Sequence, residues 1–248
     1  MRFEDRCVLV TGASRGIGRA LCGQLAAAGA RVLAVARDRE SLSDLAAELG
    51  PAVQTMCCDL TDPQQRQALI SDVISGGAPI DGLINNAGLQ IKADYALTSN
   101  PDLAADIALE AALNLEAPAH LCAALLRPLS VREGAFMVNV TSALALHPKA
   151  DAPVYCATKA GLRSFTRALR YQAQAALPGL LVSECILPLV DTGMTAGRGR
   201  GKISAEAAAA GLLRGLARGQ TEIWVGKAGM LRWINRAYPG LAARILRG

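Results

Sequence analysis

The chain has 248 residues, of which 52% are hydrophobic, 19% charged and 4% aromatic, with a net charge of +5. This content supports a large buried core, and single α/β domains of this length are common, so we expect one domain spanning residues 1–248. No apolar run approaches the roughly 18 residues of a membrane helix. The N-terminal MRFEDRC lacks the layout of a signal peptide, so we expect a cytoplasmic protein without an integral membrane segment.

The charge and the cysteines exclude further classes. The positive charges are spread along the chain and aromatic residues are few, which argues against a nucleic-acid-binding protein and suits an anionic small ligand. The seven cysteines form no Cys-x-x-Cys pair and no Cys/His cluster. We therefore expect buried reduced thiols, with neither a disulfide framework nor a metal site.

Short apolar runs alternate along the chain with longer segments of helical periodicity. The runs are continuously apolar, which is typical of parallel strands covered on both faces. This alternation predicts a doubly wound α/β fold in which helices flank a parallel seven-stranded sheet on both faces. The strands are expected at residues 7–10, 31–36, 53–57, 81–85, 135–140, 180–186 and 222–226.

A glycine-rich turn, TGASRGIG at residues 11–18, follows the first strand. Such a turn lets the backbone approach a dinucleotide pyrophosphate, which the N-terminus of the next helix stabilises. A tight strand-to-helix turn without a ligand can show the same glycines, so the turn alone is weak evidence. The residues that would contact the dinucleotide here are Gly12, Ser14, Arg15, Gly16, Ile17 and Gly18.

Further motifs follow in a fixed order. Asp59 lies in CDL, NNAG occupies residues 85–88, Asn114 and Ser142 come next, and a Tyr-x-x-x-Lys motif begins at Tyr155. The ordered set, which spans residues 7–192, resembles the short-chain dehydrogenase/reductase family. The resemblance implies a Rossmann domain that binds a nicotinamide cofactor.

Two segments resemble one subgroup more closely. NNAGLQ and LPLVDTGM (187–194) are similar to the D-alanylation-operon-type oxidoreductases. The chain departs from the broad family at Leu187-Pro188-Leu189, where Pro-Gly is more common, so we expect the second half of that loop to lie differently.

The Tyr-x-x-x-Lys motif can perform acid–base chemistry. Tyr155 and Lys159 lie four residues apart, which on a helix places them on one face. A phenol has a pKa of about 10, and we expect the neighbouring ammonium to lower it. The pair would then protonate a carbonyl oxygen in reduction and deprotonate an alcohol in oxidation. An isolated motif of this kind is more often a surface pair.

The resemblance adds two catalytic residues. Ser142 would hold the substrate carbonyl, whereas its neighbour Thr141 is expected to be an ordinary strand residue. Asn114 would organise a water that connects Lys159 to solvent; the alternative is an asparagine on a helix surface.

The resemblance also implies cofactor contacts in three further segments. Asp59 would accept a hydrogen bond from the adenine amino group. Tyr155 and Lys159 would also contact the cofactor. The other cofactor-binding residues implied by the resemblance are Leu60, Asn86, Ala87, Gly88, Pro188, Val190 and Thr192.

The end of the second strand indicates which dinucleotide binds. An acid there would bind the ribose 2′-hydroxyl of NAD, whereas a basic residue accommodates the 2′-phosphate of NADP. The strand ends in Ala36 and Arg37 follows, with Arg15 expected on the same side. Two guanidinium groups favour NADP (NADPH). Asp38 argues for NAD, but it falls one position too late.

The remaining candidates are weaker. His120 is expected to be structural, and His147 to pack or to border the substrate pocket. The Gly/Arg-rich segment 192–204 is either a substrate lid, with Arg198, Arg200 and Lys202 meeting acidic groups, or a solvated loop. The basic tail 227–248 is expected to pack on the core or on a neighbouring subunit rather than on anionic lipid.

These observations predict an NADP-dependent oxidoreductase that interconverts a ketone and a secondary alcohol. The alternative is a catalytically silent dinucleotide sensor or scaffold. The expected partner is a small carbonyl or hydroxyl compound, held by apolar walls at 89–97, 143–153 and 189–203. A homodimer or homotetramer is expected to form through the Ala/Leu-rich helices 103–126 and 155–176.

Overall fold

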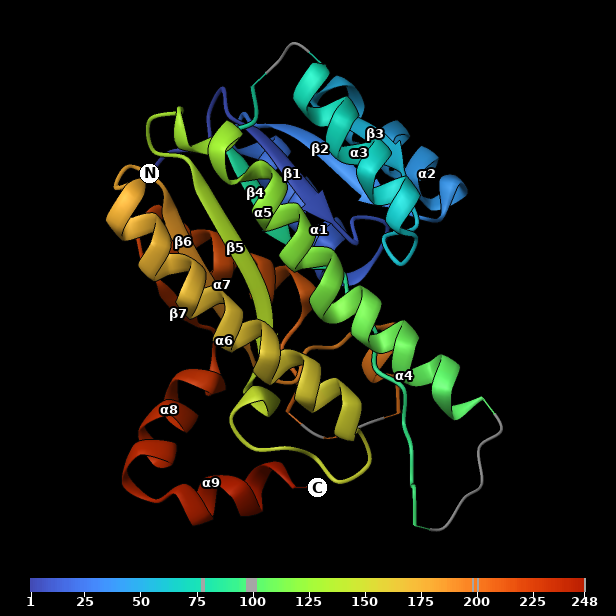
Figure 1. Ribbon diagram of the computed structural model, residues 1–248, viewed down its shortest axis with the longest axis vertical. Helices are drawn as coiled ribbons and strands as arrows, with labels where there is room; N and C mark the ends of the chain where they lie inside the picture. Colours follow the sequence, from blue (N-terminus) through green and yellow to red (C-terminus); the bar gives the residue numbers. More distant parts are fainter. Residues whose placement is uncertain (77–78, 97–101, 198, 200, 248) are drawn as a thin grey trace.

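The computed structural model describes residues 1–76, 79–96, 102–197, 199 and 201–247. Seven strands form one parallel sheet in the order β3-β2-β1-β4-β5-β6-β7 (Figure 1). The strands are β1 (Cys7–Thr11), β2 (Arg31–Ala36), β3 (Val53–Cys57), β4 (Gly82–Asn85), β5 (Phe136–Ser142), β6 (Leu181–Leu187) and β7 (Glu222–Trp224). The predicted α/β fold is confirmed, and the reversal of strand order between β1 and β4 marks where such sheets bind ligands.

Helices cover both faces of the sheet (Figure 1). One core cluster lies on the face covered by α1, α2 and α7, and the other lies beneath α3, α5 and α6. The helices are α1 (Gly16–Ala27), α2 (Arg39–Leu49), α3 (Pro63–Ser75), α4 (Leu103–Ala111), α5 (Ala117–Ser130), α6 (Pro153–Ala176), α7 (Ala205–Ala217), α8 (Lys227–Ala237) and α9 (Pro239–Leu246). Short 3-10 turns lie at η1 (Gly50–Ala52), η3 (Ala143–Ala145) and η4 (Gly193–Thr195).

The helical segment around Asn114 is interrupted. A π-helical turn, η2 (Ala112–Glu116), joins α4 to α5, and Asn114 is fully buried within it. π-Turns of this kind occur frequently at functional sites. The surface alternative for Asn114 is therefore wrong.

The last predicted strand is shorter than expected. It ends at Trp224, and Gly226 has a φ of +53°, a left-handed conformation that starts α8. The helices α8 and α9 lie beside one another at one end of the molecule, where the chain leaves the edge strand β7 (Figure 1). Pro239 separates them, as predicted, because it begins a new helix.

The cysteines are free thiols. Six are buried as expected, whereas Cys57 is exposed because it lies at the end of the edge strand β3. Among the residues that the structure describes, no helix combines the length and apolar character that crossing a bilayer requires.

Candidate active site

A cleft of about 500 Å³ opens at the carboxyl ends of the central strands. It extends from the glycine turn after β1 to Tyr155 on α6 and is bounded by the segment after β6. Of the site residues predicted from the sequence, all but Gly18 and Asn114 line this cleft. The structure thus brings together residues that are separated by up to 180 positions in the chain.

The glycine turn is shaped by contacts within the protein. Gly12 has a φ of +66°, and a Cβ there would lie 2.9 Å from the Cα of Ala87. A Cβ on Gly18 would lie 1.9 Å from the carbonyl oxygen of Gly12. Two of the three glycines are therefore required by close packing of the turn itself, in addition to any approach of a ligand.

The residues after β4 hold the turn in place. The Thr11 hydroxyl accepts hydrogen bonds from the backbone N–H groups of Asn86 and Ala87, each at 3.0 Å. The Asn86 amide donates to the carbonyl of Thr11 at 3.0 Å. This explains why small and amide-bearing residues occur there: they tie two adjacent strand ends into one rigid edge.

The N-terminus of α1 borders this cleft, which Arg15, Gly16 and Ile17 line. No side chain caps it, and its first turn carries no acid. By contrast, α2, α3 and α7 are capped by Asp38, Asp62 and Ser204, respectively. An uncapped helix N-terminus carries unsatisfied donors and partial positive charge, which suit an anionic group.

The end of the second strand is basic, as the sequence predicts. Arg15 and Arg37 are exposed and line the cleft. The Asp38 carboxylate accepts from the Ser41 backbone at 3.2 Å and from its hydroxyl at 2.7 Å, and these bonds hold the pKa of Asp38 below its usual range. Asp38 therefore acts as a helix cap.

Asp59 and Leu60 lie where β3 ends, and both line the cleft. The Asp59 carboxylate already accepts from the backbone and the hydroxyl of Thr61, at 2.9 and 2.7 Å. These bonds fix the orientation of the carboxylate at the cleft rim.

Ser142, Tyr155 and Lys159 meet at the inner end of the cleft. Ser142 is the last residue of β5, and its hydroxyl lies near the Tyr155 phenol, whose pKa it lowers. The Lys159 ammonium lies 5.8 Å from the centre of the Tyr155 ring and donates to the carbonyl of Val140 at 3.0 Å. Thr141 instead points into the core and donates to Glu184 at 2.6 Å, as expected for a strand residue.

The predicted lowering of the tyrosine pKa is not found. Burial raises the pKa of Tyr155 to about 12, although the Ser142 hydroxyl works in the opposite direction. Burial lowers the pKa of Lys159 to about 8. Desolvation is the largest cause of both shifts, so burial disfavours the charged form of each group, although Lys159, with a pKa of about 8, is still mainly protonated at neutral pH.

Two residues on the helical segment α4–η2 hold the loop after β4. The Asn114 side chain accepts from the N–H of Leu89 and donates to its carbonyl, both at 2.9 Å. One turn earlier, the buried carboxylate of Glu110 accepts from the N–H of Ile91 at 2.9 Å. Asn114 also contacts the hydroxyl of Thr158 on α6 at 3.2 Å.

Sequence reasoning missed several residues of this region, and four of them bear on the site. Glu110 carried one usable signal, because an acid among Ala and Leu residues one turn before Asn114 lies on the same helix face. Leu113, Ile245 and Leu246 line the cleft. The last two come from the far end of the chain, and no local pattern places them there.

The remaining candidate residues of the sequence analysis lie outside the main cleft or outside the described part of the chain. His147 lines a smaller pocket and bonds to Asn235 at 2.6 Å, which favours packing over a place in the main cleft. Lys202 bonds to Asp191 at 3.1 Å and to the carbonyl of Thr195 at 2.7 Å, so it stabilises its own loop. Arg198, Arg200 and position 97 of the predicted wall lie outside the described residues.

The loop after Pro188 is closed on itself. Val190 forms a parallel bridge with Ile203, and the N–H of Asp191 donates to the carbonyl of Ile203 at 2.8 Å. Pro188 and Val190 line the cleft as predicted.

A parallel sheet with its ligand cleft at the switch point, and a serine, tyrosine and lysine at the inner end, defines a dinucleotide-dependent class of oxidoreductase folds. The family model for short chain dehydrogenases matches residues 6–202, and the chain belongs to this family. The uncharacterized oxidoreductase DltE of Bacillus subtilis (strain 168) is 36% identical over 244 residues, covering 96% of this chain and 94% of that protein. This relative confirms the predicted subgroup.

Two solved structures are similar throughout. A short chain dehydrogenase from Burkholderia cenocepacia J2315 in complex with NADP has a TM-score of 0.86 and 28% identity, and all of both chains is covered. A short-chain dehydrogenase from Sphingobium yanoikuyae in complex with NADPH has a TM-score of 0.81 and 27% identity, covering 95% of this chain and 94% of that one.

Proposed function

We propose that the protein is an NADP-dependent oxidoreductase that interconverts a ketone and a secondary alcohol, with Tyr155 as proton donor and acceptor. One observation carries the proposal: Ser142, Tyr155 and Lys159 converge in the cleft that begins at the uncapped N-terminus of α1. A silent sensor would need no such convergence.

The cleft residues fit a phosphorylated dinucleotide. The N-terminus of α1 would hold the pyrophosphate, and Arg15 and Arg37 would hold the 2′-phosphate, since Asp38 is occupied as a cap. Asp59 would receive the adenine amino group, and Lys159 would reach the nicotinamide ribose. The similar structures from Burkholderia cenocepacia and Sphingobium yanoikuyae, solved with NADP and NADPH, support this assignment.

In reduction, NADPH when bound supplies a hydride to the carbonyl carbon. The Ser142 hydroxyl donates to the carbonyl oxygen and holds it beside the phenol. Tyr155, whose raised pKa of about 12 keeps it protonated at neutral pH, gives its proton to the oxygen as negative charge develops there. Each turnover is completed when the phenolate is reprotonated.

Lys159 is suited to that return of the proton. Its lowered pKa of about 8 is close to neutral pH, so it can release and regain a proton within one cycle. Asn114 would connect it to solvent through a water, and the contact of Asn114 with Thr158, beside Lys159 in the chain, is consistent with that role.

The substrate side of the cleft is apolar. Its walls come from the loops after β4, β5 and β6 and from α9, and their main side chains are Leu89, Leu113, Leu144, Leu189, Met194 and Leu246. Such walls favour an apolar ketone or alcohol.

The test is NADPH consumption by the purified protein against a panel of apolar ketones, β-keto thioesters and quinones. Tyr155→Phe and Ser142→Ala serve as paired variants with cofactor affinity measured in parallel. Tight NADPH binding without turnover of any of these classes would favour the sensor alternative.

We also propose that residues 1–248 act as one domain and assemble as a homodimer or homotetramer through α4, α5 and α6. The single sheet built from residues 7–224 and the Ala/Leu-rich faces of these helices support this. Sedimentation at micromolar concentration tests it, and a monomer would contradict it.

A further inference from the structure

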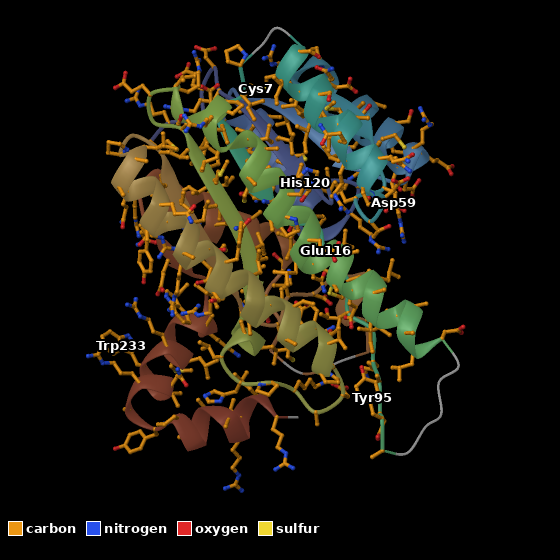
Figure 2. All side chains as sticks on the ribbon, viewed as in Figure 1. Cys7, Asp59, Tyr95, Glu116, His120 and Trp233 are labelled. Atoms are coloured by element: carbon orange, nitrogen blue, oxygen red, sulfur yellow. The ribbon has the colours of Figure 1, made fainter. Side chains whose placement is uncertain are left out.

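The C-terminal helices α8 and α9 expose an unusual amount of apolar surface. Among the described residues, eleven large hydrophobic side chains are exposed, and five of them lie in the 21 residues 227–247. We call these five the apolar stripe: Met230, Trp233, Tyr238, Leu241 and Ile245. Trp233 is 67% exposed, and Figure 2 shows its side chain directed away from the body of the molecule. The stripe is the part of the tail that does not pack on the core, and packing on a neighbouring subunit remains the alternative to a lipid surface.

The spacing of the stripe is helical. Met230 and Trp233 lie one turn apart on α8, while Leu241 and Ile245 lie one turn apart on α9. Other residues of both helices are packed inward, because Leu231 and Ala242 are buried in a cluster with Ala143 on the body. Each helix is therefore fixed by one face and leaves a second apolar face outward.

Cations accompany the stripe. The segment after Glu222 contains no acidic residue, but it carries five cations: Lys227, Arg232, Arg236, Arg244 and Arg247. On a helical projection of α8, Lys227 and Arg236 fall on either side of the line through Met230 and Trp233. An outward apolar face with basic flanks is the pattern of a helix that lies in the interface of an anionic bilayer.

We propose that α8 and α9 dock the protein on an anionic lipid surface, with the apolar stripe inserted among the headgroups and the flanking cations on the phosphates. Tryptophan and tyrosine are enriched at such interfaces because their rings are amphipathic. Ile245 belongs both to the stripe and to the cleft lining, so docking brings the rim of the cleft to the lipid surface.

Two other occupants fit less well. In a two-fold contact between copies of the chain, the same patch meets itself. The cations that flank the stripe would then face their own copies without an acid in either tail, which is repulsive. A nucleic acid would satisfy the cations and stack on Trp233, but it would leave Met230, Leu241 and Ile245 without an apolar partner.

Tryptophan fluorescence can report on binding of the stripe to lipid, because the chain has two tryptophans and only one of them lies in the stripe. Trp224 is partly buried, donates to Glu222 at 3.2 Å and lies between the guanidinium groups of Arg163 and Arg232, at 5.5 and 5.6 Å. Trp233 is the exposed one. A change in emission on vesicle binding therefore reports mainly on Trp233.

The experiment mixes the full-length protein with phosphatidylcholine vesicles that contain or lack phosphatidylglycerol. We expect co-sedimentation and a blue shift of tryptophan emission only with the anionic vesicles, and weaker binding at high salt. Trp233→Phe should abolish the blue shift and retain most of the co-sedimentation, because a phenyl ring also partitions into the interface.

Two charge-reversal variants test whether the cations of the tail contribute to vesicle binding. Arg236→Glu with Arg244→Glu should lower the vesicle affinity by about tenfold or more. Arg214→Glu with Arg218→Glu, which changes the same number of exposed cations on and beside α7, should leave it within about twofold. Circular dichroism and NADPH binding confirm that each variant is folded.

Several outcomes would overturn the proposal. These are no binding to anionic vesicles at low salt, equal losses in the two charge variants, and binding to an RNA homopolymer but not to vesicles. A blue shift that appears without lipid and disappears on dilution would instead assign the stripe to self-association.

Discussion

The glycine turn (11–18) and the loop after β6 (187–203) both line the cleft, but they are held in different ways. The turn is bonded to the next strand end through Thr11 and Asn86, and its glycines pack against neighbouring backbone. The loop is bonded mainly to itself, through the Val190–Ile203 bridge and the Lys202–Asp191 pair. The turn is thus an extension of the sheet, whereas the hydrogen bonds of the loop are mainly internal and Val190 anchors the loop in the core.

This difference separates two tasks. A rigid edge suits a cofactor whose shape does not vary, while a self-contained loop suits a substrate wall that differs between relatives. The proposed catalytic residues Ser142, Tyr155 and Lys159 lie on β5 and α6, and therefore on the rigid part. The predictions below test that division, beginning with the largest expected effect.

The first concerns the chemistry at the inner end of the cleft. Tyr155→Phe removes only a hydroxyl, so NADPH affinity should stay within about twofold while turnover falls by ~10²–10⁴, the usual contribution of a positioned acid. Cofactor titration and steady-state rates on the folded variant measure both quantities. Wild-type turnover in this variant would show that the proton comes from another group.

The second compares the two regions directly. Gly18→Ala places a methyl group 1.9 Å from the carbonyl oxygen of Gly12, so the free energy of unfolding should fall by about 3 kcal/mol or more. Gly193→Ala, in the loop, meets no atom within 4 Å and should change it by less than about 0.5 kcal/mol. Urea denaturation measures both, and equal losses would contradict the division.

The third uses the buried ammonium of Lys159. Its pKa is 10.5 when unfolded and about 8 when folded, so the unfolded chain binds more protons between these values and stability rises with pH across that window. Relative to Lys159→Met, the cofactor-free wild type should gain up to about 3 kcal/mol between pH 8 and 10.5. Tyr155 titrates in both proteins, so its contribution to the pH dependence of stability cancels in the comparison. The same pH slope in both proteins would exclude a desolvated lysine.

The fourth tests the adenosine end of the rigid edge. NADPH should bind at least about tenfold more tightly than NADH, because charge-assisted hydrogen bonds from Arg15 and Arg37 contribute about 1.5–3 kcal/mol each. Arg37→Asp should narrow or reverse that preference. Dissociation constants for both dinucleotides test this preference, and tighter NADH binding by the wild type would contradict the assignment of NADP as the cofactor.

The fifth concerns a third wall of the cleft, the loop after β4, which Glu110 holds. Glu110→Ala leaves the N–H of Ile91 unpaired and should raise the substrate KM by about tenfold with a smaller change in kcat. Glu110→Gln keeps an acceptor and should restore KM to within about twofold. Glu116→Gln, an exposed acid nearby, is the control. A loss that Gln does not rescue would show that the charge matters more than the bond.

The sequence alone determined the parallel α/β fold, because strand and helix periodicities are local and each strand is apolar throughout. It also predicted that Ser142, Tyr155 and Lys159 act together, and the structure places all three in one cleft, on one strand and one helix. The boundaries were less well predicted. The π-turn around Asn114 interrupts a continuous helical pattern, and β7 ends early at a left-handed glycine.

Only the tertiary structure decided the rest. The contact of Glu110 with Ile91, the packing of Gly18 on Gly12 and the place of Leu246 in the cleft depend on how distant segments meet, which no local pattern encodes. The same holds for the pKa of Tyr155. Charge spacing along the helix predicted a decrease, but desolvation depends on everything packed around the phenol, and it raised the pKa instead.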